Sequence, residues 1–331
     1  GIWGSNKKTI SRAKEYCATF YCTIAQLALE MLLDGTMDGL DGIITPTICD
    51  TLRPMSQNYR VAMGDKMSVI FLAHPQNRFE DFGLQFCIDQ YSHVKGELEK
   101  IAGKEITNEA IWEAIRVYNK SRAARRNFVK LAGEHCDVVT PTKRSAVLKA
   151  FWFMEKPEYT AKLEELNKEL EALPACDWQG TKVVTSGIIC DNPALLAAFE
   201  ENNIAIAADD VAHETRSFKT DVPEDEACPM MALAKQFANI DHDVLLYDPQ
   251  SEKNRRGEFV ANLVKESGAQ GLVLFMQQFC DPEEMEYPYL KKALDDAKIP
   301  HIKLGIDQQM RDFGQAKTAI QAFADVLEMS K

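Results

Sequence analysis

The chain has 331 residues, of which 46% are hydrophobic and 27% charged, a composition typical of a globular protein large enough for two α/β domains. Its 50 acidic and 38 basic residues give a formal net charge of -12, which disfavours nucleic-acid binding because nucleic-acid-binding proteins usually present a basic face. No apolar run approaches the roughly 20 residues that a membrane span requires. A local basic patch for an anionic ligand is still allowed, at Arg255 and Arg256 or at Lys291 and Lys292.

The start of the chain and its cysteine content suggest where the protein works. Residues 1–4 have the character of a strand end without an initiator Met or a signal-peptide pattern, so we expect the natural polypeptide to extend further and the first domain to be incomplete here. The nine cysteines are odd in number and irregularly spaced, which argues against a secreted disulfide scaffold. We therefore expect free thiols in a reducing cytoplasm.

The first 175 residues predict an α/β domain with a helical insertion. Residues 10–33 have the apolar spacing of one long helix, with Ser11 as a candidate N-cap. Two short β-rich segments follow, at residues 43–46 and 67–72. The rest of this half has helical periodicity, over residues 82–101, 108–131, 145–153 (after a turn at 141–143) and 157–173.

A domain boundary is predicted near residue 175, where a Pro-containing loop precedes a regular alternation of strands and helices. Such alternation predicts a parallel sheet with helices on both faces. The sequence thus predicts two Rossmann-like, doubly wound, parallel-sheet domains with additional helices, residues 1–175 and 176–331. The strands predicted in the second domain are 182–188, 204–208, 244–247, 271–275 and 301–304, and its helices are 193–201, 228–237, 253–267, 288–297 and 315–329.

Cysteines follow several of the predicted strands. Ligands of parallel α/β sheets bind beyond the carboxyl ends of the strands, and Cys49, Cys190 and Cys280 each lie in such a loop and each precede an Asp. Thiolates in a crevice suit iron–sulfur clusters or thiol chemistry. Cys49 and Cys280 both follow a buried strand, but two thiolates are too few for a cluster. Cys22 on the first predicted helix is the natural third candidate, with Cys17 as the alternative on a different face of that helix.

Other candidate residues have a structural interpretation beside the functional one. Cys190 could be a fourth ligand or line the site, but a buried cysteine usually only fills space, as we also expect for Cys87, Cys136, Cys176 and Cys228. The sequence contains no Cys-x-x-Cys motif, so it predicts neither a zinc ribbon nor a ferredoxin-type cluster. It also contains no glycine-rich phosphate-binding loop, so we do not expect the chain itself to hydrolyse ATP.

Several polar side chains near these loops also have two interpretations. Asp50 and Asp281 are expected to cap helix N-termini. His213, Glu214 and Arg216 could contact a partner or a bound anion, or form a solvated loop with an internal salt bridge. His74 is expected to be structural.

Three segments contain the candidate cysteines: residues 21–23 (Cys22), 40–51 (Cys49) and 271–292 (Cys280). Together with residues 299–307 and 313–315, they resemble the 2-hydroxyacyl-CoA dehydratase and benzoyl-CoA reductase family. The resemblance covers nearly the whole chain, and the three cysteine segments occur in the family's order, which makes it specific. Within the family, residues 212–218 are similar to the β-type subunit that acts on (R)-2-hydroxyglutaryl-CoA.

The resemblance implies a radical dehydration. Such enzymes convert an (R)-2-hydroxyacyl-CoA to the 2-enoyl-CoA, although the proton to be removed lies β to the carbonyl and is not acidic. One electron reduces the thioester to a ketyl radical anion, hydroxide leaves, the β-proton becomes acidic and the electron is recovered. A separate ATP-hydrolysing iron–sulfur activator protein supplies that electron first.

For this chain the resemblance implies a [4Fe-4S] cluster on Cys22, Cys49 and Cys280 in the crevice between the two domains, with one iron that has no cysteine ligand. It implies a heterodimer with an α-type subunit that binds most of the acyl-CoA substrate, while this chain mainly relays the electron and is inactive alone. A flavin in the complex is compatible with the family. Two alternatives stay open: a benzoyl-CoA-reductase-type subunit, and a cluster-free α/β binding protein with incidental cysteines.

Overall fold

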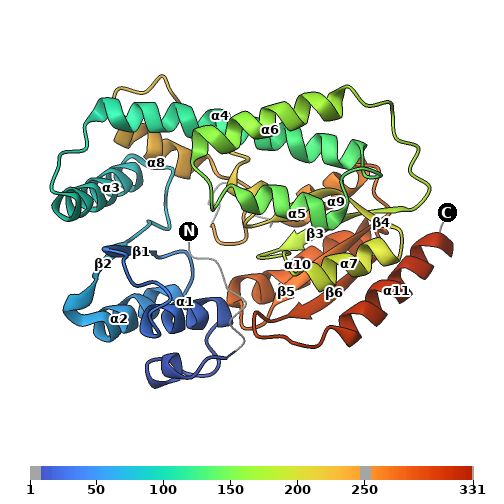
Figure 1. Cartoon of the computed structure of the whole chain (residues 1–331), viewed down its shortest axis with the longest axis horizontal. Helices are drawn as coiled ribbons and strands as arrows, with labels where there is room; N and C mark the ends of the chain where they lie inside the picture. The colour runs from blue at the N-terminus through green and yellow to red at the C-terminus, as the bar shows by residue number, and fades with distance from the viewer. Residues whose placement is uncertain (1–8, 247–254, 330–331) are drawn as a thin grey trace.

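The computed structural model describes residues 9–246 and 255–329, so the strand end predicted at residues 1–4 lies outside the described residues. In the described part, one two-stranded and one four-stranded parallel sheet are joined by a layer of long helices. Figure 1 shows the small sheet with α1 and α2 at the lower left, the helical layer across the top and the large sheet at the right. No described helix is long and apolar enough to cross a membrane.

Both strands predicted in the first half form, as β1 (Gly42–Pro46) and β2 (Ser68–Leu72). They pair in parallel, and α2 (Leu52–Met63) connects them. The prediction of one helix over residues 10–33 is wrong. Only a 3-10 turn at Arg12–Glu15 and helix α1 (Thr23–Leu33) form. The buried carboxylate of Glu30 accepts hydrogen bonds from the backbone N–H groups of Ser11 (3.0 Å) and Ala13 (2.8 Å), which holds the turn against α1.

The helical layer consists of α3 (Asp81–Ala102), α4 (Asn108–Glu134), α5 (Pro141–Ala150) and α6 (Lys156–Glu171). The turn predicted at residues 141–143 is instead the first turn of α5. Pro141 occupies an early helical position, where its missing N–H costs nothing, and Thr140 caps the helix.

The large sheet has the order β4-β3-β5-β6, with all strands parallel. Helices α7 and α11 cover one face, and α9 and α10 cover the other, so this half is doubly wound as predicted. The strands are β3 (Thr181–Gly187), β4 (Ile204–Val211), β5 (Gly271–Gln277) and β6 (His301–Ile306). The helices are α7 (Pro193–Glu201), α8 (Pro229–Asn239), α9 (Arg255–Glu266), α10 (Asp281–Asp296) and α11 (Gly314–Met329).

Two predictions for this half are wrong. Residues 244–246 form a turn rather than a strand, because the Asp243 carboxylate accepts a hydrogen bond from the backbone N–H of Leu245, and residue 247 lies outside the described part. Helix α10 begins at Asp281, seven residues before the predicted start, and continues through Pro288. The first half shows two strands in its described part, and a division at residue 175 stays a prediction.

Candidate functional site

A cavity of about 550 Å³ lies where the N-terminus of α1, the β1–α2 loop and the β5–α10 loop meet. Cys22, Cys49 and Cys280 all line this cavity, although they are far apart in the sequence. Most of the remaining wall is apolar. It includes Ile24, Ile43, Ile48, Leu52, Trp152, Ile188, Leu245 and Pro282.

Each of the three cysteines lies at the N-terminus of a helix. Cys22 is the N-cap of α1, Cys280 is the N-cap of α10, and Cys49 lies two residues before Thr51, the N-cap of α2. Free backbone N–H groups at helix N-termini stabilise negative charge. The N–H groups that face the sulfurs belong to residues 24 and 25 for Cys22, 51 and 52 for Cys49, and 283 for Cys280.

Burial nevertheless dominates the protonation of these thiols. It raises the pKa of Cys22 to about 11 and that of Cys280 to about 12, and it also raises the pKa of Cys49, while the backbone N–H groups act in the opposite direction. The sulfurs are close enough for Cys49 to raise the pKa of both other thiols. Three thiolates in this apolar cavity therefore need a compensating cation, which thiolate donors find in a soft metal centre.

The spread of the donors distinguishes between kinds of metal centre. Among the described residues, no three His, Cys, Asp or Glu side chains form a group that could hold one metal ion. A single zinc ion needs its ligands within about 2.3 Å of one point. In an iron–sulfur cluster each thiolate binds a different iron. Three thiols around a cavity thus suit a cluster better than a single ion.

Two buried polar residues of the wall were missed by the sequence reasoning. Gln277, the last residue of β5, is fully buried and donates through Nε2 to Oγ1 of Thr23 at 3.1 Å, which ties the segment before Cys280 to the residue after Cys22. Tyr59 donates through its hydroxyl to the backbone oxygen of Ala25 at 3.1 Å and so joins α2 to α1. A polar residue at the end of an apolar strand was the available signal for Gln277.

The two alternative cysteines lie outside the cavity wall. Cys17 is buried in the core between α1 and α2, and its Sγ donates to the backbone oxygen of Ala13 at 2.9 Å. Cys190 is buried in the core of the large sheet. The fold thus brings together Cys22, Cys49 and Cys280, and their role as ligands stays a prediction.

The family model for the D-component of 2-hydroxyglutaryl-CoA dehydratase matches residues 1–327 of this chain. The chain belongs to this family. It is 65% identical to the β subunit of (R)-2-hydroxyglutaryl-CoA dehydratase from Acidaminococcus fermentans and 42% identical to the (R)-phenyllactyl-CoA dehydratase β subunit of Clostridium sporogenes, in each case over 99% of this chain and 86% of the relative. A benzoyl-CoA reductase subunit of Thauera aromatica is 22% identical, over 98% of this chain and 84% of the relative. The predicted family resemblance is confirmed.

Neither predicted aspartate cap is present in this family member. The N-cap residues of α2 and α10 are Thr51 and Cys280, whereas Asp50 precedes the first cap and Asp281 is the first residue of α10. In α10 the N-cap position is occupied by Cys280, so Asp281 cannot be the cap. The Asp281 carboxylate still lies in the first turn, where negative charge is favourable.

The segment after β4 also differs from its prediction. Glu214 and Arg216 do not belong to a solvated loop, because both are buried in ion pairs within this chain. Arg144 on α5 bridges Glu214 and Asp209, and Arg216 contacts Glu283 of α10. His213 lies with Nδ1 3.0 Å from the backbone oxygen of residue 188.

Three of the four residues in the predicted basic patches pair with carboxylates. Arg256 is buried among acidic side chains, and Lys291 and Lys292 each pair with an Asp four residues later on α10. The structural interpretation of His74 agrees with its position against the ring of Phe237, at 4.6 Å between centroids.

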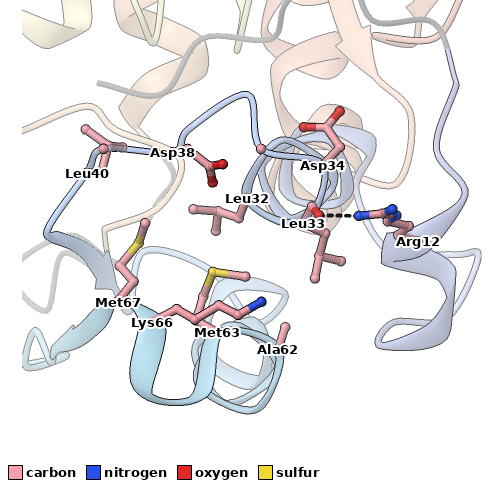
Figure 2. Close-up of a pocket in the computed structure, with 12 residues that line it drawn as sticks. Arg12, Leu32, Leu33, Asp34, Asp38, Leu40, Ala62, Met63, Lys66 and Met67 are labelled. Atoms are coloured by element: carbon pink, nitrogen blue, oxygen red, sulfur yellow. Dashed lines mark hydrogen bonds between the residues drawn. The ribbon is translucent and has the colours of Figure 1, made fainter.

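A second hollow, of about 350 Å³, lies at the opposite end of α1. Figure 2 shows its charged side chains, Arg12, Asp34, Asp38 and Lys66, and the hydrogen bond from Arg12 to the backbone oxygen of Leu33. The described residues that line it include no cysteine, and Asp38 and Lys66 are exposed to solvent. This hollow therefore lacks the buried donor set of the cysteine-lined cavity.

Proposed function

We propose that this chain is the β-type subunit of a heterodimeric hydro-lyase that converts (R)-2-hydroxyglutaryl-CoA to glutaconyl-CoA, and that it holds a [4Fe-4S] cluster on Cys22, Cys49 and Cys280. The observation that carries the proposal is the meeting of these three thiols in one cavity. The 65% identical relative supports the substrate, since it is a β subunit of (R)-2-hydroxyglutaryl-CoA dehydratase.

The chain's own residues would provide the environment for one-electron transfer, the chemistry that an iron–sulfur cluster supplies when bound. The helix N-termini stabilise the thiolates with backbone N–H groups. The apolar wall excludes water, and the contact of Gln277 with Thr23 holds two of the cysteine-bearing segments together. Cys22 and Cys49 belong to residues 1–175 and Cys280 to residues 176–331, so the cluster would join the two proposed domains.

The proposal assigns the remaining functions to other proteins. An α-type subunit would bind most of the acyl-CoA substrate, and an ATP-hydrolysing iron–sulfur activator would supply the first electron. This chain would relay the electron and be inactive alone, with a flavin as a further component to test for in the complex. The names of the relatives as β subunits support an α-type partner.

The ligand assignment is tested by anaerobic co-expression with the α subunit, followed by iron, sulfide and electron paramagnetic resonance analysis. We expect roughly four irons for this chain, and loss of this chain's signal in Cys22→Ser, Cys49→Ser and Cys280→Ser. Cys17→Ser and Cys190→Ser are matched controls, because both thiols are buried outside the cavity wall and should leave the iron content unchanged. Full clusters in all three ligand variants would refute the assignment.

The same preparation separates the competing functions. A benzoyl-CoA-reductase-type subunit is supported only by the 22% identical relative, and it predicts reduction of an aromatic thioester rather than dehydration of a 2-hydroxyacyl-CoA. A cluster-free binding protein predicts no iron or sulfide after strictly anaerobic purification.

A further inference from the structure

Two buried arginines hold the first two turns of α10, the helix that begins next to Cys280. Arg216 donates through Nη2 to Oε1 of Glu283 at 2.7 Å, and Arg256 donates through Nη1 to Oε2 of Glu286 at 2.6 Å. The side chains of Arg216, Arg256 and Glu283 are at most 2% exposed, and that of Glu286 is 10% exposed. These charges therefore act on one another with little screening by water.

The arginines are anchored at the carboxyl ends of two strands of the large sheet. Arg216 also donates to the backbone oxygen of Gly187, at the end of β3, at 2.5 Å. Arg256 donates to Oδ2 of Asp210 on β4 at 2.7 Å and to Oγ of Ser186 on β3 at 2.8 Å. The beginning of α10 is thus fixed to β3 and β4 by ionic contacts.

Glu283 connects this network to the cysteine. Its backbone N–H faces the Cys280 sulfur and lowers the pKa of that thiol, whereas its carboxylate raises it, both in addition to the larger effect of burial. Glu283 lies in the first turn of α10, three residues after the N-cap Cys280, and its side chain is buried, so its carboxylate acts on the sulfur with little screening by water. Arg216 and, at 3.9 Å, Arg256 offset the charge of that carboxylate.

Stability alone does not account for so many buried charges. Well-packed apolar side chains of similar volume often stabilise a protein as well as a buried ion pair does. A network that ends at the helix turn facing Cys280 has a second effect, since each of its charges changes the electrostatic potential at the sulfur.

We propose that Glu283 and Arg216 are positioning residues that set the reduction potential of the cluster through the fixed charges behind Cys280. The inference rests on the proposed function, because it requires a cluster at this cysteine. Reduction adds negative charge, so Arg216 makes reduction easier and Glu283 makes it harder. The two residues hence have opposite effects, which a purely structural role would not produce.

The test is a redox titration of the anaerobically purified heterodimer, followed by electron paramagnetic resonance. The component that is missing from a Cys280→Ser heterodimer identifies the cluster of this chain. At a fixed applied potential, we expect Glu283→Gln to raise the ratio of reduced to oxidised cluster roughly tenfold and Arg216→Met to lower it by a similar factor. The double variant should return towards the wild-type ratio.

Two control variants separate charge from shape. Glu286→Gln removes a carboxylate one turn further along α10, whose N–H does not face Cys280, and should change the ratio less than Glu283→Gln does. Arg216→Lys keeps the positive charge and should stay within about twofold of wild type, so it and Glu283→Gln decide the matter if Arg216→Met fails to fold.

Shifts of the same sign in Glu283→Gln and Arg216→Met, or a Glu283→Gln shift no larger than that of Glu286→Gln, would overturn the inference while leaving the proposed function intact. If Arg216→Lys lowers the ratio of reduced to oxidised cluster as much as Arg216→Met does, the inference is also overturned. If the Cys280→Ser heterodimer keeps every component of the wild-type signal, the proposed function itself is overturned.

Discussion

Arg144 offers a quantitative test of the buried charges between α5 and the large sheet. Its guanidinium pairs with Asp209 on β4 and with Glu214 after it, and the three side chains are at most 2% exposed. Burial by itself would lower the pKa of Arg144, but the two carboxylates outweigh burial and raise it. The variant Arg144→Met keeps most of the side-chain volume and removes the charge.

The expected cost follows from what each carboxylate retains. Asp209 still accepts hydrogen bonds from the backbone N–H groups of Val211 (3.1 Å) and Thr215 (3.0 Å), so its charge stays compensated in part. Within the described part of the chain, Glu214 keeps only the His213 ring, whose Nε2 lies 3.7 Å away and which forms an ion pair with it only when protonated. Breaking a buried pair in this way costs about 3–5 kcal/mol. Most of that cost should come from Glu214.

Urea unfolding of the anaerobic protein measures this cost. Arg116→Met is the control, because Arg116 pairs with Glu113 on the exposed face of α4, where such a pair contributes at most about 1 kcal/mol. Adding Glu214→Gln to Arg144→Met should recover at least about 1 kcal/mol, since it removes the uncompensated charge. A loss no greater than that of Arg116→Met, or no recovery in the double variant, would refute the reasoning.

Three further changes test local features of the fold. Gly187→Ala should strongly destabilise the protein, because φ of Gly187 is +133° and the new Cβ would lie 2.3 Å from the backbone oxygen of Phe275. Gly305→Ala is the control, since its new Cβ would meet no described atom within 4 Å, and thermal unfolding compares the two variants. Burial lowers the pKa of His74, so the unfolded state binds its proton first and the unfolding free energy should fall as pH drops below about 6.5, with a shallower pH slope in His74→Gln. Asn192→Ala should cost about 1 kcal/mol in urea unfolding, because this side chain caps α7, and an unchanged midpoint would contradict the capping.

The sequence alone determined the features that depend on neighbouring residues. Apolar runs of strand length, in regular alternation with helical segments, predicted the four strands of the large sheet and the positions of Cys49 and Cys280 after strands. These predictions succeeded because a strand or a helix shows its periodicity within a short segment of the chain. The family resemblance added Cys22, and the structure places that cysteine in the same cavity wall.

Tertiary structure decided the features that depend on contacts between distant segments. The chain breaks before Cys22, which makes this residue a helix N-cap instead of a mid-helix residue, and the buried carboxylate of Glu30 holds the preceding turn against α1. The partners of Arg216 and of Gln277 come from segments far away in the chain. No local pattern records such partners, because the free energy of a buried polar group depends on which other groups the fold brings to it.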